Sequence, residues 1–187
     1  MTIQLYGFWR SNAAFRVRVA LALKNLPFEE IDIDILSGRQ FDPGYADVNP
    51  EHVVPTLVHD GRLVFQSLAI VEYLDDITAE PRLLPTDAAE RAYARSLAMI
   101  LAADVHPLTV PRVRKYLGQV LGADTAAIES WCRHWTAEGS RPTSACWCDV
   151  HPSPLRWERR RRSPTSASPA RWRWPMSTAW ISQRFPR

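Results

Sequence analysis

The first 77 residues alternate between strand-like and helix-like patterns in a regular order. Residues 3–6 form a short apolar run that predicts a buried strand, and residues 28–35 alternate apolar and polar positions as a second strand does. Residues 12–24, between them, repeat apolar positions with helical spacing. The predicted helix has one apolar face, formed by Phe15, Val19, Ala22 and Leu23.

A hairpin followed by a helix is predicted over residues 54–74, VPTLVHDGRLVFQSLAIVEYL. Pro55 enters an alternating strand, a His-Asp-Gly turn follows, and a second alternating strand comes next. Gln66 and Ser67 then precede apolar residues at helical spacing. With a loop and short helix over 40–47, the predicted order is β-α-β-α-β-β-α, which is typical of a small α/β domain.

The rest of the chain divides by composition. Residues 79–85 contain two prolines and predict a linker. Residues 86–117 and 125–139 repeat apolar positions at helical spacing and predict two helices. The predicted parts are an α/β domain, a linker, a helical domain and a tail of different composition, at 1–78, 79–85, 86–139 and 140–187.

The hairpin and the start of its helix have the features of a site for a small peptide. Pro55 is a candidate for a cis peptide bond, which would turn the backbone groups of Val54 toward a ligand. Ser67 is placed to cap a helix whose N-terminal N–H groups attract a carboxylate. Taken singly, a trans edge-strand proline and an ordinary serine cap explain these residues better. Their combination in this order favours the ligand site.

Length, cysteines and hydropathy limit the class of protein. The 187 residues suffice for one large domain or two small ones. Cys132, Cys146 and Cys148 are an odd number without framework spacing, which indicates a reducing compartment. No apolar run reaches the length of a membrane span, and the N-terminus lacks a signal-peptide pattern. We expect a soluble, cytoplasmic protein without a membrane partner and, because the histidines lack ligand spacing, without a metal.

Six segments of residues 1–139 together carry a family resemblance. They are SNAAFRVRVAL at 11–21, NPEHVVPTL at 49–57, DGRLVFQSLAIVEYL at 60–74, RLLPTDAAERA at 82–92, DVHPL at 104–108 and WCRHWTAEG at 131–139. The chain resembles the cytosolic glutathione transferases, specifically the zeta class that includes maleylacetoacetate isomerase. The SxxxxRVR, HPL and RHW segments are the zeta-specific part. The resemblance implies a thioredoxin-like N-terminal domain, an all-α C-terminal domain that is incomplete here, and a homodimer.

The resemblance implies glutathione as the cofactor and places its ligands on matching positions. Ser11 occupies the position whose hydroxyl holds the glutathione sulfur, before a helix N-terminus that also favours a thiolate. The residues expected to bind glutathione are Ser11, Asn12, Ala13, Gln40, Val54, Pro55, Gln66, Ser67 and His106. Zeta enzymes often have serine and then cysteine after this position, whereas this chain has asparagine and alanine, so no protein thiol is expected to take part. The usual Asn-Leu pattern near residues 110–112 is absent, and no role is carried over there.

The implied activity is glutathione-dependent cis–trans isomerisation of an unsaturated dicarboxylic diketo acid, as from maleylacetoacetate to fumarylacetoacetate in aromatic amino-acid catabolism. Glutathione thiolate would add to the double bond, allow rotation and leave again, so glutathione is not consumed. Arg16 is expected to be catalytic and, with Arg10, to pair with substrate carboxylates, although a structural ion pair explains Arg16 equally well. A general transferase or dehalogenase of the same fold, and a non-catalytic glutathione-binding protein, are also compatible with the sequence.

Composition changes sharply at residue 140. Residues 140–187 contain 10 of the 23 Lys and Arg residues but only 2 of the 20 acidic ones, so the rest of the chain is net acidic. The segment WERRRR at 157–162 suits an arm that binds nucleic acid or an anionic surface. A shifted reading frame in GC-rich coding sequence explains the same composition, and residues 162–168 and 179–186 can be encoded so that one displaced frame yields zeta-like stretches. We favour the frameshift and expect no nucleic-acid partner.

A frameshift has a consequence for stability. The family segment that is missing after residue 139 would cover apolar faces of the predicted helices, and its loss exposes them. We therefore hypothesise that the chain is poorly stable or prone to aggregation, with a disordered tail and an impaired activity. A cooperative thermal unfolding transition of the purified, soluble chain would contradict this hypothesis.

Overall fold

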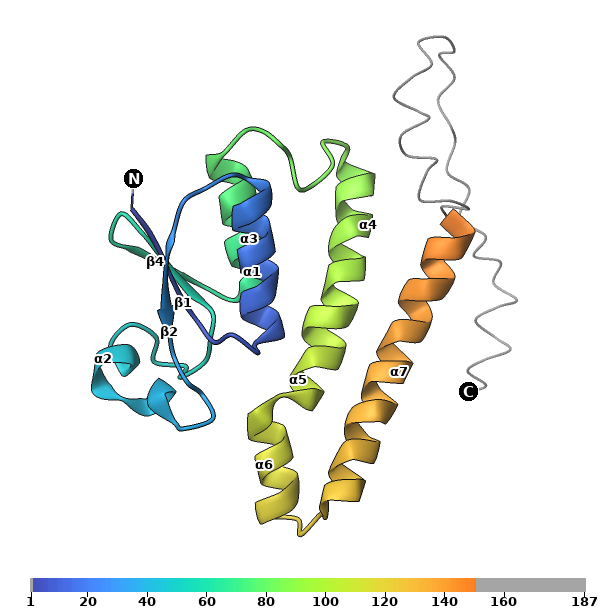
Figure 1. Ribbon diagram of the computed structural model, residues 1–187. Coiled ribbons are helices and arrows are strands. Elements are labelled where there is room, and N and C mark those ends of the chain that lie inside the picture. Colours follow the sequence, from blue (N-terminus) through green and yellow to red (C-terminus); the bar gives the residue numbers. More distant parts are fainter. Residues whose placement is uncertain (1, 151–187) are drawn as a thin grey trace. The chain divides into compact units, whose positions relative to one another are not determined.

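A four-stranded mixed sheet forms the first part of the computed structural model, which describes residues 2–150 and, for side chains, residues 2–141 (Figure 1). The strands are β1 (Ile3–Gly7), β2 (Glu29–Asp32), β3 (Thr56–His59) and β4 (Arg62–Phe65), in the order β2-β1-β3-β4. β1 pairs parallel with β2 and antiparallel with β3, which forms a hairpin with β4. The predicted hairpin and strands are confirmed, although β2 is shorter than expected.

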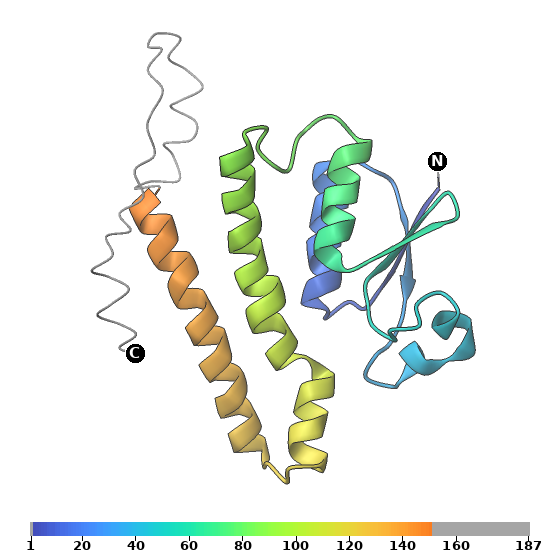
Figure 2. The same cartoon turned by 180° about the vertical axis from the view of Figure 1, so that it is seen from behind.

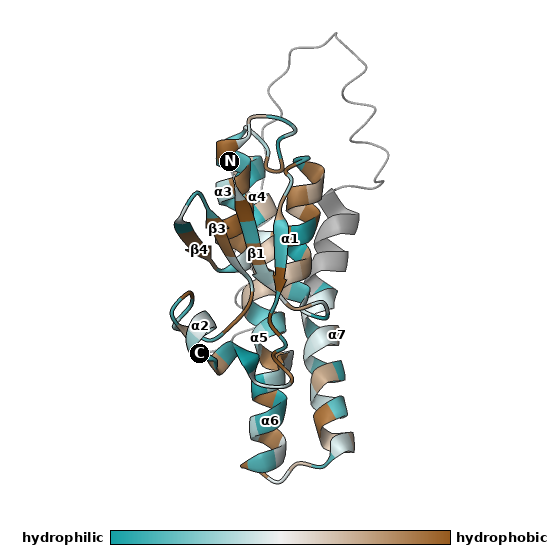
Figure 3. Ribbon diagram, turned by 60° about the vertical axis from the view of Figure 1, so that its left-hand side comes forward, coloured by the Kyte–Doolittle hydropathy of each residue, from teal (hydrophilic) through white to brown (hydrophobic). Residues whose placement is uncertain are grey.

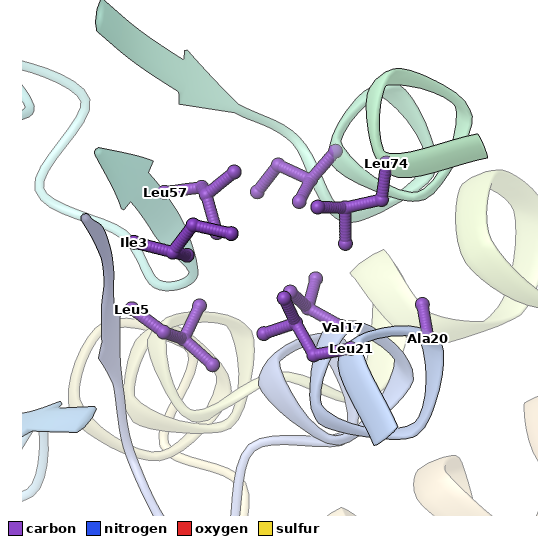
Figure 4. Close-up of a cluster of buried hydrophobic side chains, with 8 residues drawn as sticks. Ile3, Leu5, Val17, Ala20, Leu21, Leu57 and Leu74 are labelled. Atoms are coloured by element: carbon purple, nitrogen blue, oxygen red, sulfur yellow. The ribbon is translucent and has the colours of Figure 1, made fainter. Parts of the chain in front are cut away.

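Two helices cover one face of this sheet (Figure 1, Figure 2). α1 (Asn12–Leu23) makes the crossover that the parallel pair requires, and α3 (Ser67–Ile77) follows β4. The 3-10 turn η1 (Arg39–Phe41) and α2 (Pro43–Ala46) precede β3, which confirms the predicted order of elements. The core lies between sheet and helices and contains Ile3, Leu5, Val17, Ala20, Leu21, Leu57, Ile70 and Leu74 (Figure 4).

The buried face of α1 is not the apolar face that we predicted. Phe15, Val19 and Leu23 are 59%, 40% and 54% exposed, whereas Val17 and Leu21 are fully buried. Both sides of α1 are apolar, so helical spacing alone could not decide which side faces the sheet. The buried side contains three alanines of the helix, whose small side chains allow α3 and the sheet to approach closely.

A buried ion pair joins α1 to α3 and to the predicted linker. Lys24 Nζ lies 2.6 Å from Asp75 Oδ1, and the two side chains are 0% and 8% exposed. Lys24 also donates to the Thr78 carbonyl at 2.8 Å. The Asp75 carboxylate accepts hydrogen bonds from the N–H groups of Leu83 (2.7 Å) and Leu84 (3.2 Å). Residues of the linker are therefore fixed to the sheet domain.

The described part after the linker is helical. It comprises α4 (Ala88–Met99), the π-helical turn η2 (Ile100–Val105), α5 (His106–Thr109), α6 (Pro111–Gln119) and α7 (Thr125–Val150). Hydrophobic and hydrophilic residues are interspersed along α6 and along the coloured part of α7 (Figure 3). An ion pair of 2.7 Å between Glu72 and Arg95 links α3 to α4. Residues up to Cys146 belong to one compact unit.

The single long helix predicted over 86–117 is wrong. The backbone leaves the helical conformation at Val110 (φ −68°, ψ 157°), between α5 and α6. Val110 precedes Pro111, whose ring disfavours the helical conformation at the preceding residue. The Val-Pro pair was therefore the sequence signal for this break.

The predicted end of the last helix at residue 139 is also wrong, because α7 continues to Val150. Ser140 Oγ donates to the Thr136 carbonyl at 2.7 Å, and Arg141 pairs with Glu138. Such local contacts extend a helix even where apolar residues no longer recur at helical spacing. The loss of that spacing after residue 139 had predicted the end of the helix. Residues 140–150 were predicted as the start of a disordered tail and belong to α7 instead. Residues 151–187, with the rest of the predicted tail, the basic arm and the displaced-frame segments, lie outside the described residues.

Candidate functional site

A cavity of about 1110 Å³ is lined by the first residues of α1 and α3, by the loop before β3, and by residues of η2, α5 and α6. All the residues with a role predicted from the sequence line it: Arg10, Ser11, Asn12, Ala13, Arg16, Gln40, Val54, Pro55, Gln66, Ser67 and His106. These residues come from segments that lie far apart in the sequence. The fold thus brings them to one place, while their individual roles stay predictions.

Ser11 lies at the N-terminal end of α1, where polar groups converge. Its Oγ accepts a hydrogen bond from the Ala14 N–H at 3.2 Å, and its own N–H donates to the Phe8 carbonyl at 2.9 Å. Asn12 and Ala13 follow in the first turn of the helix, whose N–H groups give this end a partial positive charge. The Ser11 hydroxyl keeps its own proton to donate, so the position suits an anion such as a thiolate.

The loop before β3 presents backbone groups to the cavity. The Val54–Pro55 peptide bond is cis, as the sequence suggested. The carbonyl of Val53 is occupied, since it accepts hydrogen bonds from the Tyr45 hydroxyl and from Asn49 Nδ2 at 3.0 Å. In contrast, neither the N–H nor the carbonyl of Val54 has a hydrogen-bond partner within residues 2–150. An extended peptide can therefore pair with Val54 as an added strand does.

Asn49 is the buried centre of this loop, and sequence reasoning missed it. It is 1% exposed, and its Oδ1 accepts the Glu51 N–H at 3.0 Å while its Nδ2 also donates to Thr56 Oγ1 at 2.9 Å. The Tyr45 hydroxyl lies 3.1 Å from the same Thr56 oxygen, and burial raises the pKa of Tyr45. The Asn-Pro pair at 49–50 indicates a turn but not a buried side chain, so only the structure shows this network.

Ser67 does not cap α3, so that prediction is wrong. It is the first residue of α3, and the capping position belongs to Gln66, which has a positive φ of 68° and makes no side-chain cap. The Ser67 oxygen instead accepts hydrogen bonds from Nε and Nη2 of Arg16 at 3.1 and 3.0 Å. Arg16 has no ion pair within the described residues, and burial lowers its pKa. A carboxylate at this end of α3 would therefore meet a guanidinium as well as free N–H groups.

Gln40 and Gln66 also face the cavity. Gln66 Nε2 donates to Glu51 Oε2 at 3.1 Å. Gln40 has its carbonyl hydrogen-bonded by His52 Nδ1 at 3.0 Å, but its side-chain Oε1 is buried without a partner in the part of the chain that the structure describes. A buried acceptor without a donor is costly, and a ligand N–H would satisfy it. The residues present thus fit a small peptide ligand.

The residues of α5 and α6 that line the cavity include basic side chains. His106 begins α5, and burial, followed by the charges of Arg16 and Arg112, lowers its pKa. Arg112 and Arg114 of α6 also line the cavity, although no role was carried over to this segment. Arg10, in the loop before α1, also lines the cavity, with its guanidinium 5.5 Å from the centroid of the Trp9 ring. These basic side chains suit an anionic small molecule beside the peptide site.

Among the described residues, no group of three His, Cys, Asp or Glu is placed to hold a metal ion. None of the helices in that part of the chain is both long and apolar enough to cross a membrane.

The first domain matches a known family model. Residues 1–76 match the glutathione S-transferase N-terminal domain. A maleylpyruvate isomerase from Ralstonia sp. is 38% identical over 137 residues, which cover 73% of this chain and 65% of that protein. A probable maleylacetoacetate isomerase from Vibrio cholerae is 42% identical over 142 residues, which cover 74% of this chain and 66% of that protein. The chain thus spans just under two thirds of the length of these curated relatives.

A solved structure extends the similarity to the three-dimensional fold. The maleylacetoacetate isomerase from Methylobacterium extorquens AM1 was crystallised with bound malonate and GSH. It superimposes with a TM-score of 0.72 at 42% sequence identity, over 74% of this chain and 65% of that one. The similarity therefore includes described helices that follow the sheet domain.

Proposed function

Because the chain belongs to the glutathione S-transferase family, we propose that it binds glutathione in this cavity and isomerises an unsaturated dicarboxylic diketo acid such as maleylacetoacetate. One observation carries the proposal: every residue for which the sequence implies a role lines the same cavity. The named relatives are isomerases of this kind of substrate. Since the chain spans only part of their length, the complete reaction is part of the proposal.

The sheet domain supplies the groups that bind and orient glutathione. Ser11 donates its hydroxyl proton to the sulfur, and the N-terminus of α1 favours the ionised form. Val54 pairs with the peptide backbone, while Arg16 and Ser67 receive a carboxylate. When bound, glutathione supplies a thiolate that adds to the substrate double bond, permits rotation and is released again by elimination.

The basic wall holds the substrate. Arg10, Arg112 and Arg114 offer guanidinium groups that the glutathione carboxylate does not use, and a substrate with two carboxylates needs at least two of them. The bound malonate of the M. extorquens relative is itself a dicarboxylate. His106, kept neutral at neutral pH by its lowered pKa, can hydrogen-bond without adding another charge to this wall.

The assembly and the location of the protein complete the proposal. A homodimer is carried over from the family resemblance, and a cytoplasmic location from the cysteine pattern. Sedimentation velocity of the purified chain measures the first directly. A monomer at micromolar concentration would contradict the proposed dimer.

The test is a turnover assay on the full chain with limiting glutathione. Maleylacetoacetate or maleylpyruvate is supplied in large excess, and the cis and trans products are followed by absorbance and chromatography. We expect many turnovers for each glutathione, with a total glutathione concentration that does not fall. Replacing Ser11 by Ala should lower kcat about 10²-fold or more, as the loss of a group that stabilises a reacting anion does. Stoichiometric loss of glutathione would indicate a transferase, and failure of the chain to bind glutathione would contradict the proposal as a whole.

A further inference from the structure

The γ-glutamyl end of glutathione carries two opposite charges, and Arg16 with Ser67 accounts for only the negative one. Its α-carboxylate suits the N-terminal end of α3, where Arg16 contacts Ser67. Its α-ammonium group is attached to the same carbon atom, so it must lie within a few bonds of that carboxylate. Four arginines line the cavity and would repel an ammonium group, so a specific site needs a carboxylate nearby.

Glu51 is the one acidic residue among the described residues that line the cavity. Its Oε2 accepts a hydrogen bond from Gln66 Nε2 at 3.1 Å, and Gln66 directly precedes Ser67. The carboxylate of Glu51 is thus tied to the residue next to the predicted carboxylate site. This arrangement puts an anion beside a cationic site, which matches the two charges of an α-amino acid.

The backbone of Glu51 is also fixed in place. Its N–H donates to Oδ1 of Asn49, the buried residue that holds Val53 as well. One buried side chain therefore sets the positions of Glu51 and of the turn that presents Val54. An ordered carboxylate loses less conformational entropy when it binds an ion than a free surface glutamate does.

We propose that Glu51 binds the α-ammonium group of the γ-glutamyl residue of glutathione. The inference rests on the proposed function, because it assumes that glutathione occupies the cavity. Glu51 then acts as a specificity residue for an amino-acid zwitterion. Gln66 orients the carboxylate of Glu51, and Ser67 with Arg16 receives the carboxylate of the ligand.

A ligand analogue isolates this contact. Glutaryl-cysteinyl-glycine is glutathione with the α-amino group replaced by hydrogen, so it keeps the carboxylate, the peptide backbone and the thiol. Binding of both ligands to the full chain is measured by isothermal titration calorimetry. The proteins are the wild type, Glu51→Gln and the control Glu72→Gln, in which a partly exposed acidic residue away from the cavity lining loses its pairing with Arg95.

The wild type should prefer glutathione over the analogue by about two- to five-fold, the range for an exposed ion pair. Glu51→Gln should bind glutathione more weakly by that same factor and bind the analogue unchanged, so that the preference disappears. Glu72→Gln should keep the wild-type preference. Because Glu51 and Gln66 are exposed, added salt should also reduce the preference of the wild type.

Each other result overturns the inference in a recognisable way. A preference for glutathione that persists in Glu51→Gln shows that another group binds the ammonium. Equal affinity of the wild type for both ligands shows that Glu51 pairs only with Gln66. If the wild type binds neither ligand, the proposed function falls and the ammonium site falls with it.

Discussion

The wall of the cavity formed by the sheet domain rests on a buried core, whereas the wall formed by η2, α5 and α6 does not. α1 and α3 contribute buried residues, of which Val17, Leu21, Ile70 and Leu74 belong to the core cluster. α4, η2, α5 and α6 contain no buried residue in the part of the chain that the structure describes. Asn49, which holds the loop of the first wall, is buried, whereas Arg114 of the second wall is exposed.

This difference in packing predicts that glutathione binding and catalysis depend on regions of different stability. A region with few buried contacts opens at a low free energy, while a region with a packed core opens only with global unfolding. The peptide site therefore belongs to the stable part of the molecule and the substrate wall to the weaker part. We therefore expect glutathione binding to survive changes that abolish isomerisation.

The largest effect is expected at the buried ion pair that connects the sheet domain to the linker. Replacing Asp75 by Ala leaves Lys24 charged, buried and without its partner, and should lower the free energy of unfolding by about 3–5 kcal/mol. The control is Glu72→Ala on the same helix, which breaks a more exposed pair with Arg95 and should cost about 0–1 kcal/mol. Urea unfolding followed by circular dichroism measures both. Equal losses of unfolding free energy in the two variants would mean that the Lys24 ammonium group reaches solvent once Asp75 is removed.

The same pair gives stability a defined pH dependence. Burial by itself raises the pKa of Asp75, but hydrogen bonds from the Leu83 N–H, the Lys24 ammonium and the Leu84 N–H together hold it below its ordinary value of 3.8. A carboxylate with a lowered pKa stabilises the fold above about pH 4, and this contribution is lost as the pH falls through the folded-state pKa. The stability difference between wild type and Asp75→Ala should therefore shrink below about pH 4. A difference that stays constant to about pH 2 would contradict this account.

A pair of leucines compares the two regions directly. Leu57 is fully buried in the core, so Leu57→Ala should cost about 2–5 kcal/mol and weaken glutathione binding with it. Leu101 of η2 is 45% exposed, so Leu101→Ala should cost about 0.5 kcal/mol or less. Thermal unfolding and glutathione titration of both variants check these values. Similar losses of stability in the two variants would contradict the distinction between a stable and a weak region.

The sequence predicted more of the sheet domain than of the helices. The order of strands and helices follows from local apolar patterns, and the residues around the cavity follow from the family resemblance. The break at Val110 was readable from the following proline but was missed, because the apolar spacing continues through it.

Several further features depend on partners that are distant in the sequence. Lys24 contacts Asp75 only through the packing of α1 on α3. The Ser67 oxygen likewise accepts a hydrogen bond from Arg16 of another helix. The choice of the buried face of α1 has the same origin, because two apolar sides compete for one sheet. Local patterns contain no information about which of these contacts is made.

A smaller effect is expected where a buried hydroxyl positions the peptide site. Tyr45→Phe removes the hydroxyl that hydrogen-bonds the Val53 carbonyl and Thr56 Oγ1, and should weaken glutathione binding several-fold, with about 0.5–1.5 kcal/mol of stability lost for each bond. Tyr73→Phe is the control: it removes a phenol hydroxyl that hydrogen-bonds His59 Nδ1 at 2.7 Å, but lies outside the cavity lining. Its affinity for glutathione should equal that of the wild type. If both variants lose affinity equally, Tyr45 supports only the domain and does not orient Val54.

The smallest effect is expected on the basic wall. Arg114→Gln removes an exposed charge and should raise KM for the dicarboxylic substrate about two- to five-fold, without changing stability or glutathione affinity. Arg133→Gln on α7 removes an exposed arginine that pairs with Glu129 outside the cavity lining, and serves as the control. Steady-state kinetics at saturating glutathione, at low and high salt, separate the two, because only the Arg114 effect should fade as salt screens the substrate charge. If Arg114→Gln instead weakens glutathione binding, the peptide ligand contacts α6, and the two walls do not bind cofactor and substrate separately.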